Sequence, residues 1–307
     1  MATEAQTHIP VLLEETIAAL AVKPGGRYVD GTFGRGGHSR EIARHGGEVL
    51  GIDRDDEAVA AAGEIKVVKG RHGEIKEIAN ENGWSEVDGV LLDLGVSSPQ
   101  LDDAGRGFSF LREGPLDMRM DRSQGMSAAD IVNGESAERL EEIFRELGEE
   151  PAARRIARGI AARRGFRTTS DLAGFVERIS PRRGSRHPAT RVFQALRMAV
   201  NDEIGELKRA LSGGLALLRP GGRFAVISFE SLTDRTVKRF FSDHAGRMVS
   251  LQQGGEMWSG TAPRVRIVTR RAITASESEM SRNPRSRSAR LRASEKEQEV
   301  LKPCAET

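Results

Sequence analysis

Three aspartates, each placed where an apolar run meets a turn, are the residues of this chain best suited to chemistry. Asp30 follows Tyr-Val and precedes a turn with glycines at positions 34, 36 and 37. Glycine adopts positive φ angles and carries no side chain that would keep a ligand from the backbone. The turn after a parallel strand is also where doubly wound sheets bind nucleotides. The segment therefore predicts a nucleotide-cofactor site.

The other two aspartates fit the same kind of site. Asp53 ends the run E-V-L-G-I-D, and a carboxylate there can accept hydrogen bonds from both hydroxyls of an adenosine ribose. Asp93 ends V-D-G-V-L-L-D, and the turn after it is expected beside the glycine turn, where substrate and cofactor meet. Asp93 is therefore a candidate for contact with the cofactor's amino-acid end or with the acceptor. The structural alternatives are a helix N-cap for Asp53 and a turn cap for Asp93.

The spacing of the glycines separates two classes of cofactor. A dinucleotide-binding turn has the pattern G-x-G-x-x-G, but Ser39 stands where the third glycine is needed. The pattern D-x-T-x-G-x-G-G is instead similar to the first motif of S-adenosylmethionine (SAM) methyltransferases. An ordinary glycine-rich turn is the structural alternative. The spacing favours SAM over NAD.

The remaining reactive residue types form no recognisable site. The histidines show no metal-binding spacing, and no pair of nucleophile and base stands out. Cys304 is the single cysteine, which excludes disulfides and a cysteine-based metal site within the chain. We therefore expect no metal and, without a signal-like N-terminus or a long apolar run, a cytoplasmic protein.

Charge is distributed unevenly along the chain, although the net charge is only +2. Residues 151–200 hold 12 arginines against 2 acidic residues, and residues 264–292 hold 9 arginines against 2. Arginine suits phosphate groups because its planar guanidinium can donate two hydrogen bonds at once. The two blocks predict a surface that binds nucleic acid. The alternative is a solvated surface, or arginines paired with the acidic first half of the chain.

Alternating strands and helices would position the three aspartates. Strands are expected over 27–31, 48–53, 65–69 and 87–94, with helices over 38–46, 55–62 and 74–82. This alternation predicts an α/β fold with a parallel sheet and helices that cover it. It resumes late in the chain, with a helix over 202–218, a strand over 222–229, a helix over 231–243 and a half-exposed edge strand over 264–271. Residues 293–307 are expected to be a frayed C-terminal tail.

The interruption between these halves predicts an inserted helical domain. Residues 103–135 have no clear period, whereas residues 136–148 carry an apolar stripe typical of a helix. Ser136 is the expected N-cap of that helix and Gly148 its C-terminal glycine. Further helices are expected after Pro151, over 169–179 and over 188–200.

Longer motifs run from residue 8 to residue 292. They are H-I-P-V-L-L at 8–13, D-G-T-F-G-R-G-G-H-S at 30–39, D-L-G-V-S-S-P-Q-L-D at 93–102, R-G-F-S-F at 106–110, G-P-L-D-M-R-M at 114–120, H-P-A-T-R at 187–191, F-Q-A-L-R at 193–197 and S-R-S-A-R-L-R at 286–292. In these motifs the chain resembles the bacterial small-subunit (16S) ribosomal RNA cytosine-N4 methyltransferase family, called RsmH and formerly MraW.

The resemblance implies a fold and an activity. The fold is that of a class I SAM-dependent methyltransferase, a Rossmann-like doubly wound sheet with an inserted α-helical domain. Residues 1–102 and 201–292 would form the SAM-binding domain, residues 103–200 an arginine-rich RNA-recognition domain, and residues 293–307 the tail. The activity is methyl transfer from S-adenosyl-L-methionine to the exocyclic N4 of a cytidine in the decoding region of 16S rRNA.

The resemblance also implies partners and site residues. The partner would be the small ribosomal subunit, with no DNA or membrane partner, and the oligomeric state stays open. The cofactor site would be lined by Gly36, Gly37, His38, Asp53, His72, Asp93 and Gln100. His72 stands where the family usually has an aromatic residue against the adenine. The candidates for contact with substrate RNA are Arg154, Arg155, Arg191, Arg197 and Glu230.

Two residues depart from the family's strand-five motif, S-F-H-S-L-E-D-R. Glu230 replaces the histidine and Thr233 replaces the glutamate. The cofactor motifs are unaffected, but the protonation chemistry and the substrate are open. The candidates for an acceptor of hydrogen bonds from N4 are the Asp93 carboxylate and the Leu94 carbonyl. The alternative functions are a ribosome-assembly factor that binds SAM and RNA with reduced or lost catalysis, and a SAM methyltransferase with a non-RNA acceptor.

Overall fold

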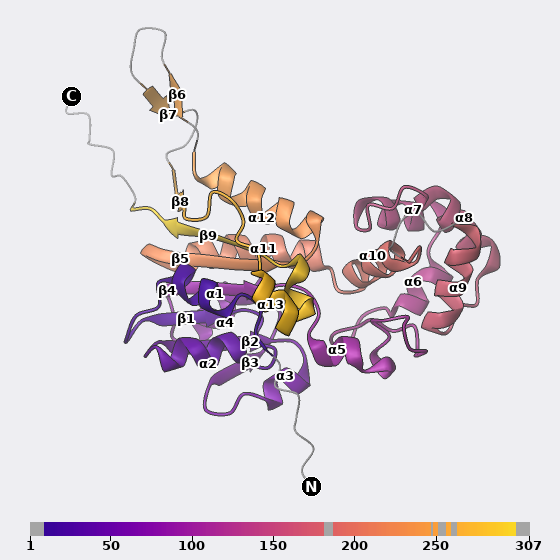
Figure 1. Ribbon diagram of the computed structural model, residues 1–307, viewed down its shortest axis with the longest axis horizontal. Coiled ribbons are helices and arrows are strands. Elements are labelled where there is room, and N and C mark those ends of the chain that lie inside the picture. Colours follow the sequence, from indigo (N-terminus) through magenta and orange to yellow (C-terminus); the bar gives the residue numbers. More distant parts are fainter. Residues whose placement is uncertain (1–8, 181–186, 247, 251–255, 259–262, 299–307) are drawn as a thin grey trace. The chain divides into compact units, whose positions relative to one another are not determined.

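The computed structural model describes residues 9–180, 187–246, 248–250, 256–258 and 263–298 (Figure 1). The chain divides into two compact units. We call Met1–Gly95 together with Glu206–Thr307 the sheet unit, and Val96–Gly205 the helical unit. The division expected from the sequence at residues 103 and 200, and the RNA-recognition role given to the insertion, stay predictions.

A seven-stranded sheet in the order β3-β2-β1-β4-β5-β9-β8 organises the sheet unit. Its strands are β1 (Arg27–Asp30), β2 (Glu48–Asp53), β3 (Lys66–Lys69), β4 (Val87–Asp93), β5 (Leu218–Ser228), β8 (Val265–Ile267) and β9 (Arg290–Lys296). Strands β1 to β5 are parallel, and β9 runs antiparallel to both of its neighbours. The strand order reverses between β1 and β4, so the predicted α/β doubly wound sheet is confirmed.

Both faces of this sheet are buried, which explains its nearly continuous apolar strands. On β5, Phe224 and Val226 face one core, whereas Ala225 and Ile227 face the other. Helices α4 (Ile75–Glu81), α11 (Glu203–Leu217) and α12 (Ser231–His244) supply the first core. Helices α1 (Leu13–Leu20) and α2 (Gly37–Arg44) supply the second.

Smaller elements complete the sheet unit. They are the helices α3 (Asp56–Ala60) and α13 (Glu277–Arg282), the 3₁₀ turns η1 (His72–Glu74) and η3 (Pro284–Ser288), and a two-stranded sheet of β6 (Met248–Ser250) and β7 (Glu256–Trp258). No helix of the described residues is long and apolar enough to cross a membrane.

The helical unit has a core of its own. Its elements are α5 (Ser98–Asp102), the 3₁₀ turn η2 (Ala104–Arg106), α6 (Ala128–Gly134), α7 (Ala137–Glu146), α8 (Ala153–Arg163), α9 (Thr169–Ile179) and α10 (Thr190–Val200). Leu140 and Phe144 of α7 are fully buried together with Ile156 and Ile160 of α8. Ser136 caps α7 as predicted, because its side chain accepts a hydrogen bond from the N–H of Arg139.

Gly148 follows the end of α7, but a glycine is needed there for a reason other than the predicted one. Glu149, with φ of 49°, adopts the left-handed conformation that we expected of the glycine. A Cβ on Gly148 would lie 2.6 Å from the carbonyl oxygen of Arg191 and 2.8 Å from that of Phe144. A glycine is therefore needed here for the close approach of α10, not for its φ angle.

Strand β9 includes residues that the sequence pattern assigns to a frayed tail. We expected residues 293–307 to be frayed, but β9 extends to Lys296 and lies between β5 and β8. Its sequence, R-L-R-A-S-E-K, has too few β-branched or aromatic residues to predict a strand. Leu291 and Ala293 are nonetheless fully buried against the sheet's core.

Candidate functional site

The glycine turn after β1 is held against β2 by an aromatic ring. Gly34 and Gly36 have positive φ angles of 55° and 70°, and Gly36 is the N-cap of α2. Phe33 is buried, and a Cβ on Gly36 or on Gly51 of β2 would lie 2.5 or 2.7 Å from its ring. Gly36 is therefore required both by the turn and by the packing of Phe33.

Gly37 and His38 contact the segment that precedes α1. A Cβ on Gly37 would lie 2.3 Å from Cγ of Pro10, so the glycine makes room for that proline. His38 is buried, and its Nε2 lies 2.9 Å from the carbonyl oxygen of Val11. Because a carbonyl only accepts, Nε2 carries the proton. Both residues fix the segment over the start of α2, and their contact with a cofactor stays a prediction.

Asp30 is a buried carboxylate at the end of β1. It accepts hydrogen bonds from the Ser39 hydroxyl at 2.6 Å and from the Thr32 N–H at 3.1 Å. Burial raises the pKa of Asp30 to about 6, although the hydrogen bonds from Ser39 and Thr32 act in the opposite direction. Its ionised form is thus costly in the folded protein and needs a nearby positive charge or donor.

Asp93, at the end of β4, lies in the same cluster. Its N–H donates to the Thr32 hydroxyl at 2.6 Å, and its Oδ2 lies 3.7 Å from Nδ1 of His38. Burial raises the pKa of Asp93 to about 6, with His38 lowering it and the charge of Asp30 raising it. The side chain nevertheless keeps 24% of its surface exposed, so a ligand can reach it. The structure therefore brings Asp30, His38 and Asp93 together.

Asp53 closes the cluster from the end of β2. Its Oδ2 accepts the N–H of Gly34 at 2.8 Å, and its Oδ1 accepts the N–H of Asp55 at 2.9 Å. A carboxylate can accept about four hydrogen bonds, so acceptor positions are left for ribose hydroxyls. The alternative role as a helix N-cap is wrong, because Asp55 caps α3. Burial raises the pKa of Asp53.

His72, in η1 after β3, lies at the same edge of the sheet. A Cβ on Gly31 would lie 3.4 Å from the Cβ of His72, so the histidine adjoins the start of the glycine turn. Within the described part of the chain, its buried Nε2 has no hydrogen-bond partner. Burial and the charge of Arg54 lower the pKa of His72 to about 4. The imidazole is therefore neutral at physiological pH.

The remaining candidates for the cofactor and acceptor sites belong to other segments of the chain. Gln100 belongs to the helical unit, where its buried side chain accepts the N–H of Ser97 at 3.0 Å. Glu230 lies just after β5 and before α12, at the carboxyl ends of the strands. Thr233 is buried in the first turn of α12. The contact of Gln100 with a cofactor stays a prediction.

The candidate RNA-binding arginines differ in their surroundings. Arg154 and Arg155 are exposed on α8. Arg191 donates to the carbonyl oxygen of Glu149 at 2.8 Å. Arg197 is only 11% exposed and makes two hydrogen bonds to Glu203, of 2.7 and 2.8 Å, so it stabilises the join of α10 and α11. Residues 182 and 183, which belong to the same basic block, lie outside the described residues.

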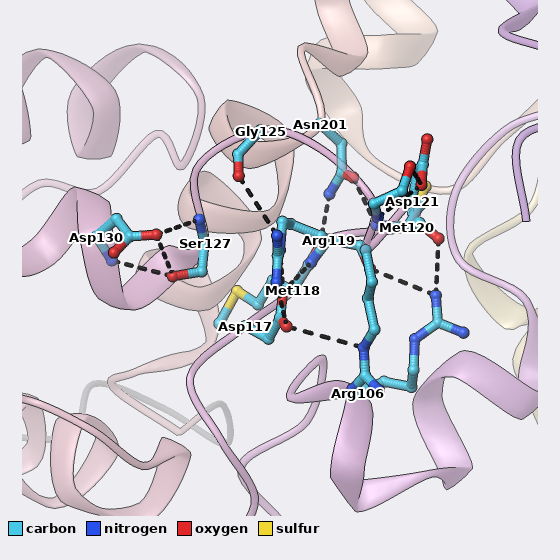
Figure 2. A network of polar contacts seen from close by, with 12 residues as sticks. Arg106, Asp117, Met118, Arg119, Met120, Asp121, Gly125, Ser127, Asp130 and Asn201 are labelled. Atoms are coloured by element: carbon cyan, nitrogen blue, oxygen red, sulfur yellow. Dashed lines mark hydrogen bonds and ion pairs between the residues drawn. The ribbon is translucent and has the colours of Figure 1, made fainter.

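The motif at 114–120 forms a polar network within the helical unit (Figure 2). Asn201 accepts the N–H of Met120 at 2.9 Å and donates to the carbonyl oxygen of Met118 at 2.8 Å. Asp117 accepts two hydrogen bonds from Arg119, of 2.7 and 3.0 Å. Burial alone would raise the pKa of Asp117, but the hydrogen bonds from Arg119 outweigh burial, and the net effect is a lowered pKa. The network gives this motif a structural role that spacing alone did not predict.

A second motif pair is also structural. Asp234 of α12 is buried and accepts hydrogen bonds from Arg292 at 2.6 and 3.1 Å and from Arg290 at 3.1 Å. Burial raises the pKa of Asp234, but the two arginines outweigh it and hold that pKa below its usual range. These ion pairs thus join α12 to β9, two segments of the sheet unit that are far apart in the sequence.

Comparisons with known proteins agree on one family. The model of the MraW methylase family matches residues 5–297. A ribosomal RNA small subunit methyltransferase H of Methylobacterium nodulans is 52% identical over 306 residues, covering 94% of this chain and 90% of that protein. The proteins of the same name from Dehalococcoides mccartyi and Nitratidesulfovibrio vulgaris are 47% and 48% identical, covering 94% and 96% of this chain and 86% and 97% of theirs.

Proposed function

The chain belongs to the MraW methylase family, and we propose that it transfers a methyl group from SAM to N4 of a cytidine in small-subunit ribosomal RNA. The family and the names of the relatives support an RNA methyltransferase. The target in the decoding region follows from the resemblance of the motifs. Ribosomal RNA as a substrate also fits the exposed arginines of α8.

One observation carries the cofactor assignment. The neighbouring parallel strands β1, β2 and β4 each end in an aspartate, and the glycine turn lies among them. Asp53 is suited to the ribose hydroxyls, and the cluster of Asp30 and Asp93 is suited to a positively charged amino-acid group. Methylation requires a cofactor site of this kind, because SAM, when bound there, supplies the electrophilic methyl group that is transferred.

As the alternative to contact with the amino-acid group, Asp93 is a candidate acceptor for the reaction itself. The lone pair of the N4 amine is conjugated with the cytosine ring, so the amine is a weak nucleophile. A carboxylate that accepts a hydrogen bond from N4 favours the amine as it becomes pyramidal and positively charged. With its pKa near 6, Asp93 is ionised at neutral pH and can accept the proton that N4 loses. Alignment at near-attack distance would supply most of the remaining rate enhancement.

The test is methylation of small ribosomal subunits that lack the cytosine-N4 mark. The purified protein is incubated with labelled SAM and these subunits, and the label is mapped by nucleoside mass spectrometry. Label on N4 of one cytidine is the expected result. Label on another acceptor would contradict the substrate, and SAM binding without transfer would favour the assembly-factor alternative that Glu230 and Thr233 keep open.

Replacing Asp93 by Ala should abolish methylation in the same assay. The matched control is Asp88→Asn, since Asp88 is also a buried carboxylate of β4 but lies near the other end of that strand. There it contacts Lys23 at 2.9 Å and accepts the N–H of Arg27 at 3.0 Å. Full activity of the Asp93 variant would remove the acceptor role.

A further inference from the structure

A buried glutamate on α11 contacts the turn that carries His72. Glu206 is only 2% exposed. Its Oε2 accepts the N–H of Gly73 at 3.0 Å, and its Oε1 accepts from Arg209 at 2.9 Å and lies 3.5 Å from Nη1 of Arg71. A buried carboxylate is tolerated only when its oxygens are paired in this way.

The approach of this carboxylate is very close. A Cβ on Gly73 would lie 2.2 Å from Oε2 of Glu206, so any larger residue would displace the carboxylate. Arg71 and Glu74 close the turn on its other side, since the N–H of Glu74 donates to the carbonyl oxygen of Arg71 at 2.9 Å. His72 therefore lies in a four-residue turn whose path is fixed by Glu206.

The same turn adjoins the candidate cofactor site. His72 lies beside Gly31, the first residue of the glycine turn, and the charges of Arg54, Glu206 and Arg209 all act on its imidazole. Arg54 follows Asp53, the residue suited to the ribose hydroxyls. The position of this turn thus decides where the imidazole lies relative to the adenosine end of the site.

We propose that Glu206 is a positioning residue for cofactor binding, which holds the imidazole of His72 against the adenine through the N–H of Gly73. The inference rests on the proposed function, because it needs SAM in the site. Glu206 acts through His72 and not on the methyl group. Its loss should therefore weaken binding of SAM and of S-adenosylhomocysteine (SAH) alike, and leave the rate at saturating SAM nearly unchanged.

The experiment compares Glu206→Ala and Glu206→Gln by calorimetric titration with SAH and by steady-state kinetics. We expect Glu206→Ala to raise the Kd for SAH and the KM for SAM about 10-fold, the scale of a lost hydrogen bond to a buried group, while kcat changes less than about 2-fold. Glu206→Gln should recover much of the affinity, because its amide oxygen can still accept the N–H of Gly73.

A double-mutant cycle with His72→Ala separates positioning from general stability. If Glu206 acts through His72, the Kd of the double variant should equal that of His72→Ala alone. Additive effects would overturn the inference, as would an unchanged Kd in folded Glu206→Ala. Should that variant fail to fold, the same cycle with Glu206→Gln decides, with additivity or unchanged affinity again contradicting it.

The control is Asp88→Asn, which also removes a buried charge but at the opposite end of the strands. It should lower thermal stability without changing the Kd for SAH. A wild-type protein that binds no SAH would overturn the proposed function and this inference together. If wild-type and the Glu206 variants bind SAH equally, only the inference fails.

Discussion

At the scale of single residues, the most informative feature is the burial of carboxylate groups. Asp30 and Asp93 lie in one cluster, and burial raises the pKa of each to about 6. A protein selected for stability alone would have little use for two such carboxylates. Their cost is understandable if a positively charged ligand group joins them, since an opposite charge restores the ionised form. Ligand binding therefore explains the cluster better than a contribution to the stability of the fold does.

Replacing Asp30 by Asn should make stability less dependent on pH. The folded-state pKa of Asp30 is raised, so its contribution to stability is present below the unfolded pKa near 3.8 and is lost as pH rises through about 6. Relative to wild type, Asp30→Asn should gain roughly 2 kcal/mol between pH 4 and pH 7. Urea unfolding at several pH values measures this, and a constant difference would contradict it. Methylation should be lost.

Two arginines should give opposite phenotypes. Arg155 is exposed, so Arg155→Ala should weaken RNA binding and reduce the salt slope by about 1 while stability stays unchanged. Arg197 is paired with Glu203, whose side chain is only 13% exposed, so Arg197→Ala should cost about 3 kcal/mol of stability by leaving that carboxylate unpaired. Filter binding at several salt concentrations and urea unfolding test the pair. A stable Arg197→Ala variant with a reduced salt slope would reverse the assignment.

At the scale of elements, β9 shows what sequence patterns miss. The strands that end in Asp30, Asp53 and Asp93 were predicted because they are apolar runs bounded by turns. Strand β9 has no such signal in its own sequence. It is held in place by pairing with β5 and β8 and by the ion pairs of Asp234, which come from distant parts of the chain. The short α6 was hidden for a similar reason, because seven residues give too little periodicity.

Breaking the contact between α12 and β9 should be costly. Asp234→Ala leaves Arg292, which is 12% exposed, without its partner, and should lower stability by about 3 kcal/mol. Hydrogen exchange should show faster exchange in β9 than in β1. Asp243→Ala is the control on the same helix, because its contact with Arg239 is exposed and should contribute less than about 0.5 kcal/mol. Equal effects of the two substitutions would contradict this account.

At the scale of the whole molecule, the chain is two compact units with separate cores. The α/β class, the glycine turn and the positions of the three aspartates were predictable from the sequence, because they depend on local patterns. Two contacts were not predictable. That of Gly73 with Glu206 depends on the packing of distant segments, and that of Arg197 with Glu203 depends on the angle between successive helices. Glycine at 73 could have signalled a close approach, but not its partner.

Calorimetry should separate the two units. Phe144 is fully buried in the helical unit, and Phe144→Ala should cost about 4 kcal/mol and lower the transition of that unit. SAH at 100 times its Kd should stabilise the sheet unit by about 2.7 kcal/mol and raise the other transition. A single transition that both changes shift equally would show that the units unfold together.

The place of β9 inside the sheet has a consequence for synthesis on the ribosome. Arg290, which starts β9, comes 62 positions after Ser228, which ends β5. At about 5 to 20 residues per second, the emerging chain carries β5 with one unpaired edge for roughly 3 to 12 seconds. Such an edge can pair with another nascent chain. The sheet is completed by a segment translated well after β5, so slowed elongation between residues 228 and 290 should raise the aggregated fraction during expression.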